Sequence, residues 1–207
     1  MSEMYHDGHR DLQQQFDTGR LAQRFEDLTH DVINDDRREF IEGRDMFFLA
    51  TVDPEGRPNC SYKGGAPGFI RVVDERTVAF PSYDGNGMYL SMGNIAETSE
   101  VGMLFIDFTG QQRLRLNGTA TMDRDDALLA EYPEAQLIVR VQVREVFANC
   151  ARYIHKMELV ERSVFVPEPD SETPVVAWKA NTIEGGRGET LPEGDTAFDA
   201  GRDVRAR

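Results

Sequence analysis

The sequence predicts a mainly β fold of the α+β class, in which six antiparallel strands form a small barrel with flanking helices. Short apolar runs separated by turn residues recur from Met46 to Thr121, and helical periodicity lies mostly outside them. The chain has 207 residues, of which 40% are hydrophobic, enough for one core domain with extensions. Short strands joined by tight turns argue against a doubly wound parallel sheet.

The charge balance disfavours several classes of partner. The formal net charge is -14, so the chain repels phosphate backbones and anionic lipids, and we expect neither nucleic acid nor a membrane surface as partner. Any anionic ligand must be held by a local concentration of donors. No apolar leader and no apolar run of about 20 residues occurs, which predicts a cytoplasmic protein. Cys60 and Cys150 are the only cysteines, without a C-x-x-C, so no metal site is expected.

Three regions are expected: a helical extension over residues 1–43, the barrel over residues 44–166, and an extended tail over residues 167–207. In the extension, one helix face recurs at steps of four and three, and a second helix is expected to begin near Thr29 or Asp31 and to end at Gly43. The residues of the first face are Leu21, Phe25 and Leu28.

The first half of the barrel follows from apolar runs and turn residues. Asp53 to Gly56 has the Asp-Pro-Glu-Gly order of a type I turn, which predicts a hairpin between the runs on either side. The expected strands are residues 46–52, 58–63, 69–73 and 77–80.

The second half alternates between strands and short helical segments. Strands are expected over residues 101–108, 113–122 and 139–143, the last two with apolar and polar residues in strict alternation. Asp123 is expected to cap a short helix, and residues 149–159 are expected to be helical. In the proline- and glycine-rich tail, residues 175–178 are the one apolar patch.

Two loops have the composition of a phosphate cradle. Ser61 and Lys63 supply a hydroxyl and a charge just before the glycine pair that begins at Gly64, and glycine lets backbone amides approach a ligand. Ser82 and Asn86 precede a short helix around Met92, whose positive N-terminal end points at the loop. The alternative for each segment is a plain hairpin or connector.

Two further groups of residues have two interpretations each. Arg113, Arg115 and Asn117 share one strand face, which is either solvated or reaches a ligand at a dimer seam. His155 either handles protons beside a ligand or is a surface histidine on a helix.

Four segments in order resemble the FMN-binding split barrel of the pyridoxamine 5'-phosphate oxidase-like proteins. The resemblance covers residues 40–122, and residues 144–157 are similar to the distal part of some uncharacterised members. The segments are the first strand with its turn, residues 61–72, the Gly85-Asn86 loop leading to Ser91 and Ile95, and Leu114 to Gly118.

The resemblance implies a homodimer with FMN at the subunit interface. It assigns Ser61, Tyr62, Lys63 and Gly64 to the FMN phosphate and ring edge, Ser82 and Asn86 to a second phosphate segment, and Arg113 or Arg115 to the isoalloxazine. The implied function is an FMN-dependent oxidoreductase acting on a small-molecule substrate. The alternative is a non-catalytic binder of flavin, F420 or haem. Gly87-Met88 replaces the Arg-Lys pair of the true oxidases, which disfavours vitamin B6 oxidation.

Overall fold

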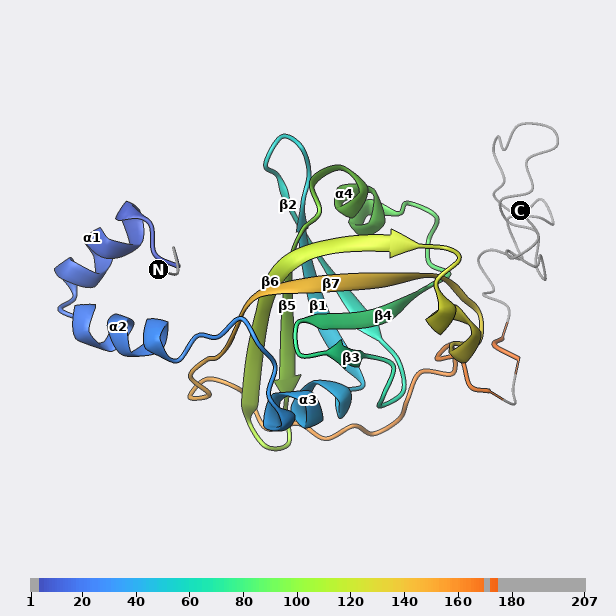
Figure 1. Ribbon diagram of the computed structural model, residues 1–207. Coiled ribbons are helices and arrows are strands. Elements are labelled where there is room, and N and C mark those ends of the chain that lie inside the picture. Colours follow the sequence, from blue (N-terminus) through green and yellow to red (C-terminus); the bar gives the residue numbers. More distant parts are fainter. Residues whose placement is uncertain (1–3, 170–171, 175–207) are drawn as a thin grey trace, which may run out of the picture.

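The predicted class is confirmed by a computed structural model that describes residues 4–169 and 172–174. Its described part contains one antiparallel sheet with the strand order β2-β1-β5-β6-β7-β4-β3, curved into a split barrel (Figure 1). The sheet has seven strands. All seven barrel segments that were predicted to be strands form strands, so the predicted total of six strands is one too low.

The two hairpins at the edges of the sheet come first in the barrel sequence. β1 (Met46–Val52) pairs with β2 (Pro58–Gly64), and the predicted turn between them is confirmed by the hydrogen bond from Gly56 N to Asp53 O, 2.9 Å. β3 (Arg71–Asp74) pairs with β4 (Thr77–Tyr83), which also pairs with β7 (Ala135–Ala148).

Helix α4 (Leu90–Thr98) connects the edge hairpins to the central strands β5 (Glu100–Asp107) and β6 (Gln112–Asp123). β6 shows the predicted alternation, with Leu114 and Leu116 buried. It then bulges against β7, where a Cβ added at Gly118 would lie 2.0 Å from the Gln142 carbonyl oxygen. Glycine is required there because no side chain fits.

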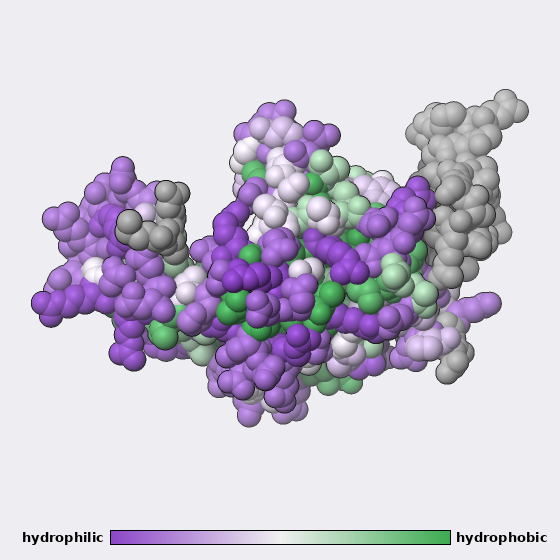
Figure 2. All heavy atoms as spheres, in the orientation of Figure 1, coloured by the Kyte–Doolittle hydropathy of each residue, from purple (hydrophilic) through white to green (hydrophobic). Residues whose placement is uncertain are grey.

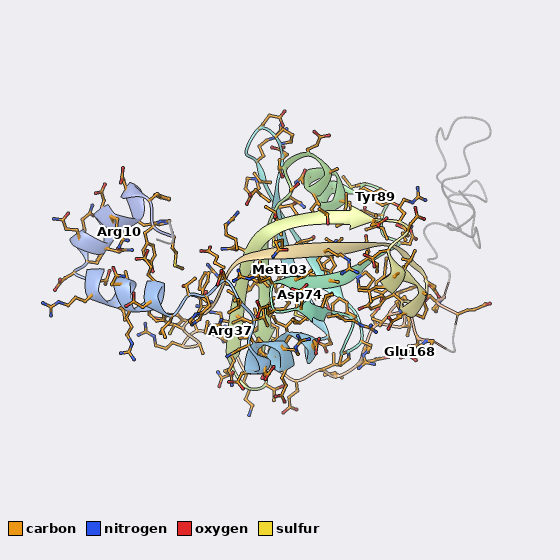
Figure 3. The ribbon with its side chains drawn as sticks, viewed as in Figure 1. Arg10, Arg37, Asp74, Tyr89, Met103 and Glu168 are labelled. Atoms are coloured by element: carbon orange, nitrogen blue, oxygen red, sulfur yellow. The ribbon has the colours of Figure 1, made fainter. Side chains whose placement is uncertain are left out.

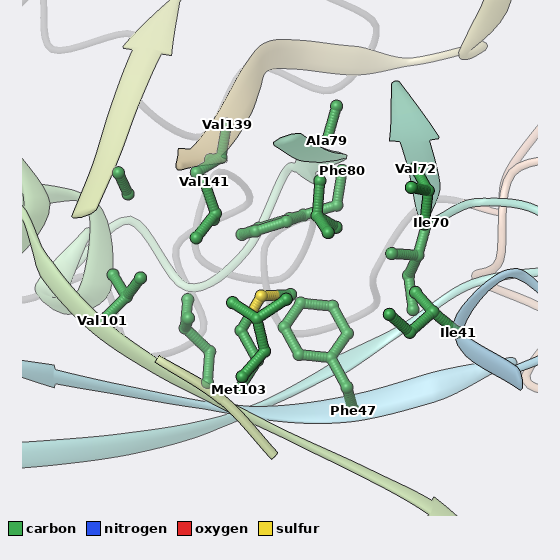
Figure 4. Close-up of a cluster of buried hydrophobic side chains, with 14 of the residues drawn as sticks. Ile41, Phe47, Ile70, Val72, Ala79, Phe80, Val101, Met103, Val139 and Val141 are labelled. Atoms are coloured by element: carbon green, nitrogen blue, oxygen red, sulfur yellow. The ribbon is translucent and has the colours of Figure 1, made fainter. Parts of the chain in front are cut away.

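The core fills the interior between the two halves of the sheet. Phe47 of β1 meets Phe80 of β4 edge to face, with ring centroids 5.0 Å apart, and both side chains are fully buried. Figure 4 shows Met103 of β5 beside Phe47, facing Val139 and Val141 of β7 across the interior.

The extension contains three helices in its described residues 4–43, rather than the two expected: α1 (Asp7–Gln15), α2 (Gly19–Asp27) and α3 (Asp35–Glu42). α3 begins later than expected, because Asn34 caps it by accepting from Arg37 N, 3.0 Å. His30 instead bridges to Val146 of β7. No helix of the described chain is long and apolar enough to cross a membrane.

Two predictions near the end of the barrel are wrong. Residues 149–159 form no helix. With residues 160–169 they make an extended segment, called the strap here, which runs past α3 along one end of the barrel (Figure 1). Asp126, not Asp123, caps the short helix η1 (Ala127–Glu131), because its side chain accepts from Leu128 N, 2.9 Å. The apolar patch predicted at residues 175–178 lies outside the described residues.

Candidate cofactor site

The hairpin β1–β2 has an inner face, turned toward the core, and an outer face. The inward residues of β1 are Phe47, Leu49 and Thr51, all buried. In the register of the hairpin these residues lie opposite Lys63, Ser61 and Asn59 respectively. Directly paired residues share a face, so the polar residues of β2 at alternate positions belong to the inner face.

α4 packs on this inner face through a polar seam. The seam consists of Thr51, Asn59, Ser61, Ser91 and Asn94. Ser61 Oγ lies 2.9 Å from Ser91 Oγ, and Asn59 Nδ2 donates to Ser91 Oγ, 3.2 Å. Asn94 Nδ2 donates to Thr51 Oγ1, 3.0 Å. The seam fixes the first turns of α4 against β2, because a half-broken buried network would leave polar groups unsatisfied.

Sequence reasoning missed the seam as a functional element. Asn59, Ser91 and Asn94 were not chosen, because small polar residues are usually interpreted as surface or turn residues. A usable signal was present: α4 repeats polar residues at Ser91, Asn94 and Thr98, which is the spacing of one helix face. Opposite it, β2 repeats polar residues with the period of a strand.

Lys63 is a partly buried cation on the inner face. Burial lowers the pKa of its ammonium. Within residues 4–169 and 172–174, no carboxylate forms an ion pair with it. A desolvated lysine without a counter-ion is costly to a folded protein, so this position favours an anion.

The N-terminal end of α4 is shaped by the loop that follows β4. Tyr89, the N-cap residue, has φ 49° and makes no side-chain capping bond. Its hydroxyl donates to Gln136 Oε1, 2.9 Å, which ties the loop to β7. Figure 3 labels Tyr89 at the start of α4. The first turn of the helix thus offers amides that no N-cap side chain satisfies.

Ser82 lies in β4, and Asn86 lies within the loop that follows it. Ser82 is buried at the end of β4 opposite Leu137, and burial raises the pKa of the next residue, Tyr83, to about 12. Asn86 Oδ1 accepts from Met88 N, 3.0 Å, so its side chain shapes the turn. No hydrogen bond of the described chain joins either residue to Lys63.

The remaining predicted residues lie on the outer face. Tyr62 is opposite Phe48, which is opposite Leu104, which in turn is opposite Arg115. Arg113 is opposite Ile106 in the same way, and its Nε is buried without a partner among the described residues. The predicted set is therefore split: Ser61 and Lys63 lie on the inner face, whereas Tyr62, Gly64, Arg113 and Arg115 lie on the outer face.

The glycine pair has a packing role that the sequence did not suggest. A Cβ added at Gly65 would lie 2.3 Å from the Phe69 ring. The Gly65 amide donates to Asp45 O, 2.9 Å, so it is not free to bind a phosphate. The predicted backbone cradle is therefore wrong at Gly65.

Two other predictions concern residues away from this face. His155 is exposed in the strap rather than on a helix. Within the described ranges, no three His, Cys, Asp or Glu side chains are grouped closely enough to hold a metal ion.

Comparison with known proteins identifies one family model. The model described as pyridoxamine 5'-phosphate oxidase matches residues 33–163, more than half of the chain. No curated protein matches the sequence.

Several solved structures are similar to this chain. An FMN-binding protein from Syntrophomonas wolfei is 12% identical, with 67% of this chain and 97% of that chain covered and a TM-score of 0.43. HutZ, the heme storage protein from Vibrio cholerae, is 20% identical, with 55% and 92% covered and a TM-score of 0.42. An F420 reductase is 20% identical, with 52% and 94% covered and a TM-score of 0.39.

Proposed function

Because the chain belongs to the pyridoxamine 5'-phosphate oxidase family, we propose that it is an FMN-binding oxidoreductase that acts on a small-molecule substrate. The observation that carries the proposal is Lys63. It is partly desolvated, has no carboxylate partner among the described residues, and lies in a chain of net charge -14. Such a cation is best explained by an anionic ligand that completes its environment.

The surroundings of Lys63 fit a phosphate monoester. Ser61 lies two residues before it on the same strand face, and Ser91 in the first turn of α4 is hydrogen-bonded to Ser61. Hydroxyl groups, one ammonium and helix amides are the donors that phosphate oxygens prefer. When bound, FMN would supply the hydride or electron chemistry, while the protein orients it and excludes water.

The split of the predicted residues supports a homodimer. Tyr62 and Arg115 lie on the face of the sheet opposite Lys63, so one chain does not offer all of them to one flavin. The outer face between them carries the apolar side chains of Phe48, Leu104 and Ile106, each partly exposed. A second copy packed on this face would bury that surface and bring its own site residues to the seam.

A titration of the purified protein with FMN tests the ligand. Lys63→Met should weaken FMN binding by about 10- to 100-fold, the loss expected for one charge-assisted contact. Arg124→Met removes an exposed cation elsewhere and is the matched control. Equal affinity of the Lys63 variant and the wild type would contradict the site. A Soret band in the visible spectrum of the purified protein would instead identify haem as the bound ligand.

Anaerobic reduction separates an enzyme from a binder. We expect NADH or NADPH to bleach the flavin absorption of the holoprotein, and an added electron acceptor to restore it. The alternative is a non-catalytic binder of flavin, F420 or haem. It predicts that the ligand stays bound but is not cycled between its reduced and oxidised forms by these reagents.

A further inference from the structure

The described chain ends beside the loop that leads into α4. Thr173 N donates to Glu134 Oε1, 3.0 Å, and Thr173 Oγ1 is buried without a partner among the described residues. Gln136, two residues after Glu134, accepts from the Tyr89 hydroxyl, 2.9 Å. Two neighbouring side chains at the start of β7 therefore connect Thr173 to the N-terminal end of α4. Figure 3 labels Tyr89 and Glu168 at this same end of the barrel.

The N-terminal end of α4 carries an apolar patch. It is called the α4 patch here and consists of Met88, Tyr89 and Leu90, each more than half exposed. Tyr89 has φ 49°, a left-handed conformation that is costly for a residue with a Cβ, and such strain clusters at ligand clamps and switch regions. Figure 2 shows pale and green residues, of intermediate to high hydropathy, gathered around α4. An exposed apolar patch of this kind favours an occupant.

The segment that follows Pro174 has the composition of such an occupant. Residues 175–178 form the longest apolar run of the polar tail, and this run ends in Trp178, the only tryptophan of the chain. A tryptophan ring gains most from packing on other side chains, and methionine sulfur and tyrosine rings are favourable neighbours for it. The α4 patch offers both, in Met88 and Tyr89.

The α4 patch is within reach of this segment. Residues 174–178 span up to about 18 Å when fully extended, at 3.3–3.6 Å per residue. Glu134, which holds Thr173, is only two residues from Gln136, about 7 Å at the spacing of a strand. Gln136 in turn contacts Tyr89 of the patch, so the segment does not have to cross the barrel to reach it.

The same reach excludes another apolar face of the described chain. The exposed leucine and phenylalanine side chains of α1 and α2 join the barrel near His30, which bridges to Val146 of β7. At the spacing of a strand, Val146 lies about 30 Å or more from Ala135, where β7 begins. That distance is too long for residues 175–178 of the same chain. Figure 1 shows α1 and α2 projecting beyond the other end of the barrel.

We propose that residues 175–178 dock on the α4 patch of their own chain and cover the N-terminal end of α4. Trp178 packs against the patch, and the Thr173–Glu134 hydrogen bond holds the chain that leads to it. Ser91 directly follows the patch and is hydrogen-bonded to Ser61. The docked segment thus closes the phosphate end of the cofactor site to water, a consequence that rests on the proposed function.

Fluorescence of the full-length protein without ligand tests the docking, because Trp178 is the only tryptophan. We expect its emission to be blue-shifted, and its quenching by acrylamide to be weaker, relative to the same chain unfolded in urea. Met88→Glu/Leu90→Glu places charges in the contact, so both quantities should move to the values of the unfolded chain. Val160→Glu/Val164→Glu adds the same charge at two exposed apolar positions of the strap and should change neither.

Three results of this measurement would overturn the proposal. The first is a Trp178 that is as accessible in the wild type as in the unfolded chain. The second is protection that survives the Met88 and Leu90 substitutions while circular dichroism shows a folded protein. The third is a strap variant that exposes Trp178 equally, because the strap would then be the docking surface.

Mixing two variants shows whether the contact lies within one chain. The Met88→Glu/Leu90→Glu protein keeps Trp178, whereas the Trp178→Ser protein keeps the α4 patch and has no tryptophan emission. After subunit exchange, a contact between two copies restores the protection of Trp178, and a contact within one chain leaves it exposed. We expect no restoration. Restored protection would overturn the proposal, because the occupant would then come from a second copy.

Release of FMN is a separate readout of the closed site. Trp178→Ser should speed FMN dissociation by about tenfold, because it opens the phosphate end of the site to water. Equal release rates from this variant and the wild type would overturn the closing of the site. A protein that protects Trp178 but binds no FMN would contradict the proposed function and support the docking, so the two failures are distinguishable.

Discussion

The two faces of the hairpin β1–β2 differ in what covers them, although successive side chains of the same two strands alternate between them. On the inner face, Asn59 and Ser61 are hydrogen-bonded to Ser91 of α4, and Lys63 lies opposite the buried Phe47. The outer face presents Tyr62, 62% exposed, beside the partly exposed Phe48. On β2 the polar side chains of this set are covered and Tyr62 is open, the reverse of an ordinary surface strand, whereas β1 has the usual arrangement with Phe47 and Leu49 buried.

The largest expected effect concerns the open outer face. Leu104→Arg places a cation at the centre of this face, between Phe48 and Arg115. If the face is the dimer interface, the two-fold axis brings in two unpaired charges, and the dimer should weaken by more than about 3 kcal/mol, over 100-fold. Sedimentation equilibrium measures the change. Thr121→Arg, on an exposed position of β6, is the control. If the Leu104 variant dimerises as strongly as the wild type, the outer face is not the dimer interface.

A smaller effect is expected from the covered inner face. Ser91→Ala removes the hydroxyl that is bonded to Ser61 and accepts from Asn59, so two partly buried groups lose a partner. The free energy of unfolding should fall by about 1–2 kcal/mol in urea denaturation. Ser163→Ala, in the exposed strap, should change it by less than about 0.5 kcal/mol. Equal stabilities of the two variants would show that the seam does not hold α4.

Local sequence patterns predicted the strands well and the site poorly, for a physical reason. Strand alternation and the Asp53–Gly56 turn are local, so the barrel class and the faces of β6 were readable. The faces of β2 could not be predicted in this way, because its inner residues are polar. Only their pairing with Phe47 and Leu49 of β1 shows which face they are on. The prediction of a helix at residues 149–159 is wrong for a related reason. Their composition favours a helix, but the segment instead makes backbone hydrogen bonds to the barrel, such as that from Met157 N to Phe108 O.

The first two helices, α1 and α2, show what a local sequence pattern does not contain. The steps of Leu21, Phe25 and Leu28 correctly indicated one helix face. The same steps do not say what the face packs on, because a stripe that meets its own core and one that meets another chain have the same period. Exposure in the folded chain makes the difference visible.

The smallest expected effect is the pH dependence of FMN binding, which tests whether Lys63 acts as a charge. Burial lowers the pKa of Lys63 in the free protein, and a bound phosphate raises it again, since the anion favours the protonated form. FMN affinity should therefore be constant below the lowered pKa and fall as the pH rises through it, before the usual lysine range near 10.4. Titrations are compared above about pH 7, where the phosphate monoester is already a dianion. Lys63→Arg keeps the charge to much higher pH, so its affinity should stay flat over the same range. Superimposable profiles for the variant and the wild type would mean that Lys63 does not contact the phosphate and that the covered face holds the ligand by hydroxyls and amides alone.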